Sequence, residues 1–194
     1  MSEKVGEKRK MVGFDAFMMN RTNPMSDLFD IHKFDHLEFY CSDATQASRR
    51  FSWGLGLPLV GKSDVTTGNT HFSSHVLKGN DITFIFTAPY CDDSLDAETK
   101  AGEVPIFKEF SQDLAHNFVR KHGLAVRAVG IRVKDAAEAF TLSTTAGAVA
   151  VTPPYTTVDK VTSKSLTISE IKLFGDSLIR WVSGDFDGEH PYHI

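Results

Sequence analysis

The sequence predicts an α+β fold in which two β-α-β-β-β modules form one open, curved, mixed β-barrel with its helices outside. A strand followed by a capped helix occurs twice, and the two capping aspartates, Asp43 and Asp135, stand 92 residues apart. Each copy is followed by three strand-like stretches that turn residues separate. Two such modules satisfy their strand edges by joining into one barrel.

The length and composition indicate a single domain. The chain has 194 residues, of which 41% are apolar and 24% charged, which is enough to form one sizeable core. We therefore predict one two-module domain between two terminal segments. The ranges are a flexible segment at 1–30, the domain at 31–184 and a tail at 185–194, with module one at 34–90, a linking helix at 105–122 and module two at 126–183.

Charge and cysteine content exclude several classes of partner. Twenty-one basic residues against 25 acidic ones leave a net charge of −4, so we expect neither nucleic acid nor a membrane surface as a partner. Cys41 and Cys91 form no CxxC pair, which argues against a cysteine zinc site and a disulfide framework. With no signal-peptide core after the charged N-terminus, these features predict a cytoplasmic protein.

Module one begins with a half-buried strand at 34–41, FDHLEFYC, whose residues alternate between two faces. The apolar set is Leu37, Phe39 and Cys41, and the polar set is His36, Glu38 and Tyr40. A helix follows, because Asp43 and Gln46 have the spacing of an N-terminal cap and Gly56 ends the apolar periodicity. Strands are expected at 58–63, 70–77 and 81–90, with the turn Lys78-Gly79-Asn80 between the last two.

The linking helix and the elements of module two are predicted from the same signals, namely helix start and end residues, apolar periodicity and turn residues. Pro105 is predicted to start the linking helix and Gly123 to end it, and its apolar stripe comprises Phe107, Phe110, Leu114 and Phe118. Module two comprises a strand at 126–133, a helix from Asp135 to near Gly147, and strands at 148–156, 166–174 and 177–183, with a turn at Gly175-Asp176.

The polar set of the first strand suggests where a ligand would lie. The opposite, apolar face packs on the helix, so His36, Glu38 and Tyr40 are expected to point into the concave interior. His36 and Glu38 could both reach one metal ion, and His71 with His75 would supply further donors. The alternative, polar residues lining a wet or hydrogen-bonded interior, is favoured because nothing beyond the His-x-Glu pair supports a metal.

Motifs of other enzyme classes are missing from the sequence. Neither GxxxxGK[ST] nor a GxGxxG that follows a strand occurs, so no phosphate cradle is expected. GxSxG is missing too, and Cys41 lies on the apolar face of its strand, which argues against a hydrolase with a serine or cysteine nucleophile.

Several runs nevertheless resemble the N-terminal domain of the plant-type 4-hydroxyphenylpyruvate dioxygenases. They include RTNP at 21–24, FDHLEFYCSDAT at 34–45, RRFSWGLG at 49–56, KSDVTTGN at 62–69, FIFTAPY at 84–90 and HGLAVRAVGIRVKDA at 122–136. The likeness extends from about residue 11 to residue 183. It implies a vicinal-oxygen-chelate, glyoxalase-like fold, in agreement with the paired modules.

The resemblance also implies a chemistry. The complete enzymes of this family use one Fe(II) to convert 4-hydroxyphenylpyruvate and O2 into homogentisate and CO2 in tyrosine catabolism. Their 2-His-1-carboxylate iron site belongs to a C-terminal domain, which this sequence does not include. The resemblance therefore predicts a truncated, inactive chain with no catalytic, cofactor-binding or metal-binding residues of its own.

The internal repeat tests whether the N-terminal barrel could replace the missing site. The family's first-strand histidine position corresponds to His36 in module one and, 92 residues on, to Ala128 in module two. The carboxylate position corresponds to Ile85 in module one and Arg180 in module two. Alanine offers no ligand atom, and a guanidinium repels Fe(II). These vestigial positions predict that the chain binds no iron.

Two other functions remain open from the sequence. The chain could be a non-catalytic assembly module that forms homo-oligomers or associates with the full-length enzyme. It could also be a stand-alone metal-dependent protein of the same fold, with His36, Glu38, His71 and His75 as its ligands.

Overall fold

The computed structural model describes residues 28–90, 110–158 and 163–184. The predictions made for the rest of 1–30, for Cys91, Pro105 and Phe107, and for the tail at 185–194 lie outside these residues. Eight strands form one sheet in the order β2-β3-β4-β1-β5-β8-β7-β6. The strands are β1 (Ile31–Tyr40), β2 (Leu59–Ser63), β3 (Phe72–Gly79), β4 (Ile82–Pro89), β5 (Ala125–Val133), β6 (Ala150–Val158), β7 (Ser165–Phe174) and β8 (Ser177–Gly184), and the helices are α2 (Ala44–Leu55), the short 3-10 helix η1 (Val65–Thr67), α4 (Gln112–His122) and α5 (Ala136–Thr145).

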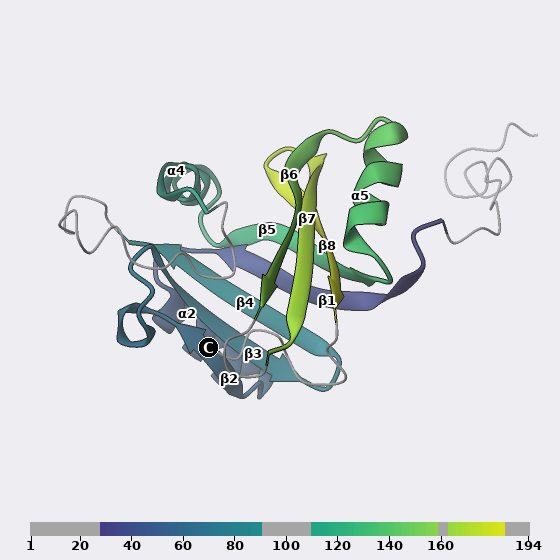
Figure 1. Ribbon diagram of the computed structural model, residues 1–194. Helices are drawn as coiled ribbons and strands as arrows, with labels where there is room; N and C mark the ends of the chain where they lie inside the picture. The colour runs from purple at the N-terminus through teal and green to yellow at the C-terminus, as the bar shows by residue number, and fades with distance from the viewer. Residues whose placement is uncertain (1–27, 91–109, 159–162, 185–194) are drawn as a thin grey trace, which may run out of the picture.

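The sheet consists of two halves that meet at the first strands of the two modules. β1 pairs antiparallel with β5, whereas β1 pairs parallel with β4 and β5 parallel with β8. The strands of the two halves run in clearly different directions, so the sheet curves around its concave side without closing (Figure 1). This confirms the predicted mixed, open β-barrel.

The strand register shows the internal repeat directly. His36 pairs with Gly130, and Glu38 pairs with Ala128. With an offset of 92 residues, Ala128 is the counterpart of His36 and Gly130 the counterpart of Glu38, so the two pairs are related by a local two-fold axis. The parallel neighbours obey the same symmetry, since Glu38 lies opposite Ile85 and Gly130 lies opposite Arg180.

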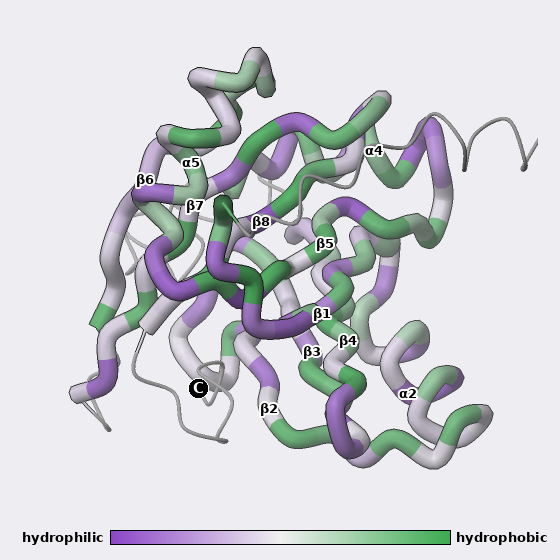
Figure 2. Tube along the Cα trace, turned by 90° about the vertical axis from the view of Figure 1, so that its right-hand side faces the viewer, coloured by the Kyte–Doolittle hydropathy of each residue, from purple (hydrophilic) through white to green (hydrophobic). Residues whose placement is uncertain are grey.

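Helix α2 covers the outer face of module one. Its N-cap Asp43 accepts a hydrogen bond from the backbone of Gln46 at 2.9 Å, and Gly56 ends the helix in the left-handed conformation, both as predicted. Hydrophobic and hydrophilic stretches alternate along α2 (Figure 2), and Phe51 packs its ring on Phe86 at 4.8 Å between centroids. The apolar face of β1 thus lies under a helix, which leaves its polar face to the interior.

Replacing the cap of α2 has a measurable expected cost. Asp43→Ala removes the only side-chain acceptor that the described residues give to this helix start. We expect the free energy of unfolding to fall by about 1 kcal/mol. Urea denaturation followed by circular dichroism measures it, with exposed Gln46→Ala on the same turn as the control. An equal loss in both variants would contradict the capping role.

Helix α5 covers the outer face of module two. It packs on β7, β6 and β8 around a cluster that contains Val133, Ala139 and Trp181. β6 is the edge strand of this half, which suits Pro153 and Pro154 because neither can donate to a neighbouring strand. The strand register shifts between Thr152 and Tyr155, around these two prolines.

Helix α4 differs from the predicted linking helix. It begins at Gln112, because Ser111 is extended and caps the helix by accepting from the Leu114 backbone at 3.3 Å. A helix that runs unbroken from Pro105 is therefore wrong. Phe118 is buried against Tyr40, whereas Leu114 is 43% exposed although it belonged to the predicted apolar stripe. α4 thus packs against Tyr40, a residue of the concave face.

Two boundaries in module one also need correction. β3 starts at Phe72, so His71 precedes the strand that was expected from residue 70. Gly79 still belongs to β3, and the turn is formed by Asn80 and Asp81. Asn80 takes the positive φ of 52° that this turn requires, which asparagine tolerates better than most residues.

None of the helices in the described ranges has the length and apolar character to cross a bilayer.

Candidate functional site: a buried polar interior

The concave side of the sheet carries charged residues that are almost fully buried. Exposure is 3% for His36, 1% for Glu38, 3% for Arg180 and 9% for Glu170. These residues come from β1, β8 and β7, so both modules contribute to one cluster. Burial of unpaired charges is costly, and their mutual arrangement therefore decides what this interior can do.

Arg180 is the centre of the cluster. Its Nη2 donates to Glu38 Oε2 at 2.7 Å, its Nε donates to Glu170 Oε1 at 2.7 Å, and its Nη1 lies 3.1 Å from His36 Nε2. Both ion pairs lie within the range of strong, charge-assisted hydrogen bonds. The guanidinium thereby connects β1 of module one with β7 and β8 of module two.

Threonine hydroxyls donate a hydrogen bond to the second oxygen of each of the two carboxylates. Thr87 Oγ1 donates to Glu38 Oε1 at 2.7 Å, and Thr152 Oγ1 donates to Glu170 Oε2 at 2.8 Å. Each carboxylate oxygen therefore has a hydrogen-bond donor. Burial alone would raise the pKa of Glu170, but the charge of Arg180 and the bonds from Thr152 and Arg180 outweigh it and hold that pKa below its ordinary value. Glu170 is thus a fixed anion.

The contacts of His36 define which of its ring nitrogens donates and which accepts. A guanidinium can only donate, so Nε2 of His36 accepts from Arg180 and Nδ1 carries the proton. That Nδ1 lies 2.8 Å from Asp35 Oδ1, and Asp35 Oδ2 in turn accepts from Arg132 at 2.8 Å. Both ring nitrogens of His36 are consequently engaged, and the lone pair of Nε2 faces a cation.

The structure separates the four residues of the alternative metal cluster. His36 and Glu38 lie together, as predicted, but both contact Arg180. His75 lies on the opposite face of the sheet, where its Nδ1 is 3.0 Å from Ser48 Oγ of α2. His71 lies before β3, next to α4, because its carbonyl accepts from the Gln112 side chain. The expectation that His71 and His75 could complete a site with His36 and Glu38 is therefore wrong, since a side chain on the outer face cannot reach the interior.

The vestigial positions do not fit an iron ion. The register places Ala128 beside Glu38, Ile85 on the neighbouring strand and Arg180 beside Gly130. Alanine and isoleucine offer no ligand atom, and the guanidinium occupies the space between the two carboxylates. Within the ranges that the structure describes, no three His, Cys, Asp or Glu side chains are grouped to hold a metal.

Sequence reasoning missed Glu170, Thr152 and the Asp35–Arg132 pair. Glu170 and Arg180 lie directly opposite each other in the β7–β8 hairpin. Their equal spacing from Gly175 at the turn is the signal that could have indicated the pair, because opposite residues of a hairpin share a face. The contacts with His36 and Glu38 join distant parts of the chain, and no local pattern indicates them.

Cys41 behaves as the sequence predicted, as a buried residue of the apolar face. Burial raises the pKa of its thiol to about 12. We expect native Cys91→Ser protein to react with dithiobis(nitrobenzoate) at neutral pH about a thousandfold more slowly than an ordinary cysteine, because the thiolate is the reactive form. Absorbance of the released thionitrobenzoate measures the rate. The same protein in urea is the control, and rapid reaction of the native protein would contradict the prediction.

Comparisons with known proteins agree with this architecture. A family model described as the N-terminal part of hydroxyphenylpyruvate dioxygenase, HPPD, matches residues 99–193. The 4-hydroxyphenylpyruvate dioxygenase of Plectranthus scutellarioides is 48% identical over 90% of this chain and 37% of the relative. That of Arabidopsis thaliana is 43% identical over 90% of this chain and 38% of the relative. The chain thus spans little more than a third of the length of these relatives.

Solved structures with low sequence identity share the fold. A triple mutant of 4-hydroxymandelate synthase from Streptomyces coelicolor superposes with a TM-score of 0.63 at 18% identity, over 81% of this chain and 40% of that chain. Methylmalonyl-CoA epimerase from Mycobacterium tuberculosis gives 0.55 at 17% identity, over 82% of this chain and 92% of that chain. The fold is therefore of the vicinal-oxygen-chelate, glyoxalase-like type. In its sequence, the chain is similar to the N-terminal part of the 4-hydroxyphenylpyruvate dioxygenases.

Proposed function

We propose that this chain is a non-catalytic module of a 4-hydroxyphenylpyruvate dioxygenase system, which supports assembly and does not perform the oxidation. Arg180 carries the proposal. Its guanidinium stands at the position equivalent to a metal-binding carboxylate and holds Glu38 and Glu170 in ion pairs of 2.7 Å. A metal ion in this interior would have to displace a buried cation from two carboxylates, which disfavours binding.

By the chemistry of the complete enzymes, an active chain also needs an Fe(II) site with open coordination positions. Fe(II) supplies the binding and activation of O2 and of the keto acid in this family, through an open 2-His-1-carboxylate face. The described residues of this chain hold their own histidine and carboxylates in hydrogen bonds to arginine. We therefore assign the iron, the substrate 4-hydroxyphenylpyruvate and the product homogentisate to the complete enzymes.

Oxygen uptake tests the lack of activity. Purified chain at high concentration is incubated with 4-hydroxyphenylpyruvate, Fe(II) and ascorbate, and homogentisate is followed in the same vessel. A flat trace beside an active full-length enzyme is the expected result. Oxygen uptake matched by homogentisate would overturn the proposal, because iron would then be held by residues assigned here to ion pairs.

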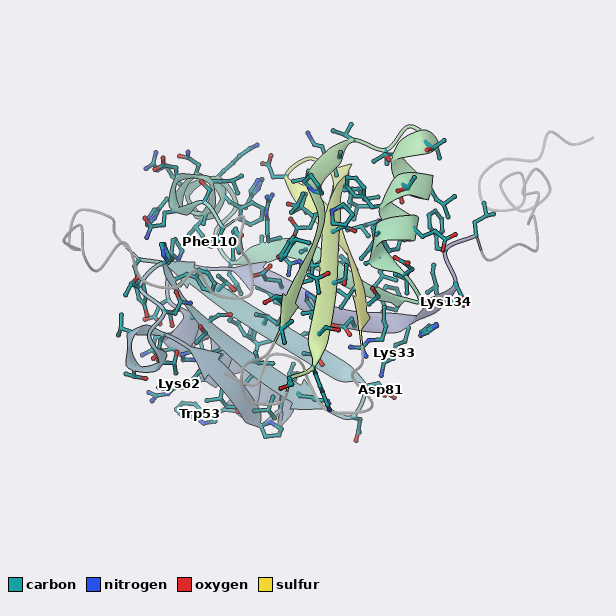
Figure 3. The ribbon with its side chains drawn as sticks, in the orientation of Figure 1. Lys33, Trp53, Lys62, Asp81, Phe110 and Lys134 are labelled. Atoms are coloured by element: carbon teal, nitrogen blue, oxygen red, sulfur yellow. The ribbon has the colours of Figure 1, made fainter. Side chains whose placement is uncertain are left out.

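The partner in the proposed role is a second copy of this chain or the full-length enzyme. Single large apolar side chains are exposed on both modules, with Trp53 at 82%, Phe34 at 74% and Phe174 at 70%. Trp53 projects outward from α2 (Figure 3). Sedimentation velocity at rising concentration, alone and with the full-length enzyme, is expected to show association. A strict monomer that also ignores the enzyme would contradict the assembly role.

The remaining sequence predictions stay proposals. The positions of His71 and His75 do not support a stand-alone metal-dependent function. Metal analysis of untagged protein tests this function. A stoichiometric metal ion that is lost in His36→Ala would support it. A cytoplasmic location, with neither nucleic acid nor membrane as a partner, is likewise proposed from the composition, and cell fractionation tests the location.

A further inference from the structure

A cavity of about 490 Å3 lies along α2, on the outer side of module one. Residues of α2 line it from the N-cap to the last turn, and Leu124, directly before β5, lines it as well. Figure 2 shows α2 at the outer edge of the molecule. The Arg180 cluster belongs to the opposite, concave side of the sheet, so this cavity is a separate feature of the surface.

One face of α2 forms the floor of the cavity. Asp43, Ala47, Arg50 and Gly54 line it, and their spacing of four, three and four residues places them on one side of the helix. Gly54 has no side chain and Ala47 has only a methyl group. The distance between two packed helices depends on the side chains at their contact, so this face permits a close approach by another helix.

Exposed apolar side chains border the same cavity. Leu55 is 60% exposed and Leu124 is 47% exposed, and both belong to the lining together with Ala47 and Phe51. Because they share one cavity, these residues form a continuous apolar surface and not a set of single exposed side chains. Continuous apolar surface bordered by polar residues is typical of a protein–protein contact.

The two charges of this face indicate which partner fits it. Asp43 and Arg50 are both exposed. Since seven residues separate them, they lie about 10 Å apart along the helix, which is too far for an ion pair with each other. In a two-fold symmetric contact, residue i of one copy meets residue j of the other and the reverse. A second α2 that lies antiparallel in the cavity therefore pairs Asp43 with Arg50 twice.

We propose that the cavity along α2 is a self-association surface, on which two copies of this chain pack their α2 helices antiparallel. The two-fold axis passes next to Gln46 and Ala47, midway between the two charges. Each copy covers the apolar border of the other, and Asp43 contacts Arg50 of the partner subunit. This inference rests on the proposed assembly role and assigns that role to one surface.

Charge reversal tests the contact in the full 194-residue chain. Arg50→Glu places a carboxylate opposite Asp43 at both ion pairs and is expected to raise the Kd of the dimer about tenfold or more, because like charges then face each other. Arg49→Glu makes the same change on the adjacent exposed residue, which is not among the described residues that line the cavity. It is expected to leave the Kd within about threefold. Sedimentation velocity at rising concentration measures both.

Disulfide formation tests the antiparallel geometry. Gln46→Cys in a Cys91→Ser background places an exposed thiol beside the two-fold axis, whereas Cys41 is buried. Mild oxidation is expected to produce a covalent dimer about tenfold or more faster than in Arg49→Cys, because a disulfide requires the two Cβ atoms to come within about 4.5 Å. Non-reducing gel electrophoresis measures the rate.

The outcomes separate this surface from the assembly role. Dimers that both arginine variants weaken equally, or that oxidation links no faster in Gln46→Cys than in Arg49→Cys, would place the contact elsewhere and overturn the inference while the assembly role stands. A strict monomer that still binds the full-length enzyme would also overturn only the inference. A strict monomer that ignores the enzyme would overturn both.

Discussion

Replacing Arg180 with methionine is expected to lower the free energy of unfolding by about 3–5 kcal/mol, because it leaves Glu38 and Glu170 buried without their cation. His36 loses a hydrogen-bond donor in the same step. Small domains have a total stability of about 5–15 kcal/mol, so much of it would disappear. Urea denaturation followed by tryptophan fluorescence measures the loss.

Two further variants separate the ion pairs from the size of the side chain. Arg120→Met removes an exposed arginine from α4 and is expected to change stability by less than about 0.5 kcal/mol. Adding Glu38→Gln and Glu170→Gln to Arg180→Met removes both uncompensated charges and is expected to recover most of the loss. A loss below about 1 kcal/mol in Arg180→Met alone would show that the buried charges do not depend on Arg180.

The difference in stability between the wild type and Arg180→Met is expected to depend on pH. In the wild type the pKa of Glu170 is lowered, so its ionic interactions stabilise the fold above the unfolded-state pKa and are lost as the pH falls through the folded value. In Arg180→Met the cation is gone and burial, which raises the pKa, dominates. The difference between the two proteins is therefore expected to be largest at neutral pH and to shrink as the pH approaches 4.5, the ordinary value for glutamate.

Gly130→Ala is expected to destabilise the protein by about 2–3 kcal/mol through overpacking. A Cβ atom on Gly130 would lie 2.5 Å from Cε1 and Nδ1 of the His36 ring and 2.9 Å from its Cγ. The ring cannot move aside without breaking its contacts with Asp35 and Arg180. The midpoint of thermal unfolding, together with urea denaturation, measures the effect.

Gly54→Ala is the matched control for this substitution. Gly54 lies inside α2, and a Cβ atom there would meet no atom within 4 Å. Alanine is expected to stabilise the helix by about 0.5–1 kcal/mol. The two glycine-to-alanine changes should therefore move stability in opposite directions. If Gly130→Ala left the free energy of unfolding unchanged, the His36 ring would be free to move, which would contradict its fixation by Asp35 and Arg180.

Much of the architecture could be predicted because it rests on local chemistry. Alternation in β1 assigned His36 and Glu38 to one face and Phe39 and Cys41 to the other, and the structure confirms both assignments. The caps Asp43 and Asp135 marked two helix starts that the structure shows at the next residue. Spacings of two residues and of three to four residues suffice for these predictions, since they follow from strand and helix geometry.

The sequence by itself therefore determined the two-module fold, the polar face of β1 and the absence of ligand atoms from the side chains of Ala128 and Ile85. The tertiary structure alone decided that His75 faces α2, that α4 begins at Gln112 over Tyr40, and that Arg180 binds carboxylates from two modules. The reason is physical. A buried arginine takes its partners from wherever the folded strands bring carboxylates within hydrogen-bond distance, and Glu38 and Arg180 are 142 residues apart in the chain.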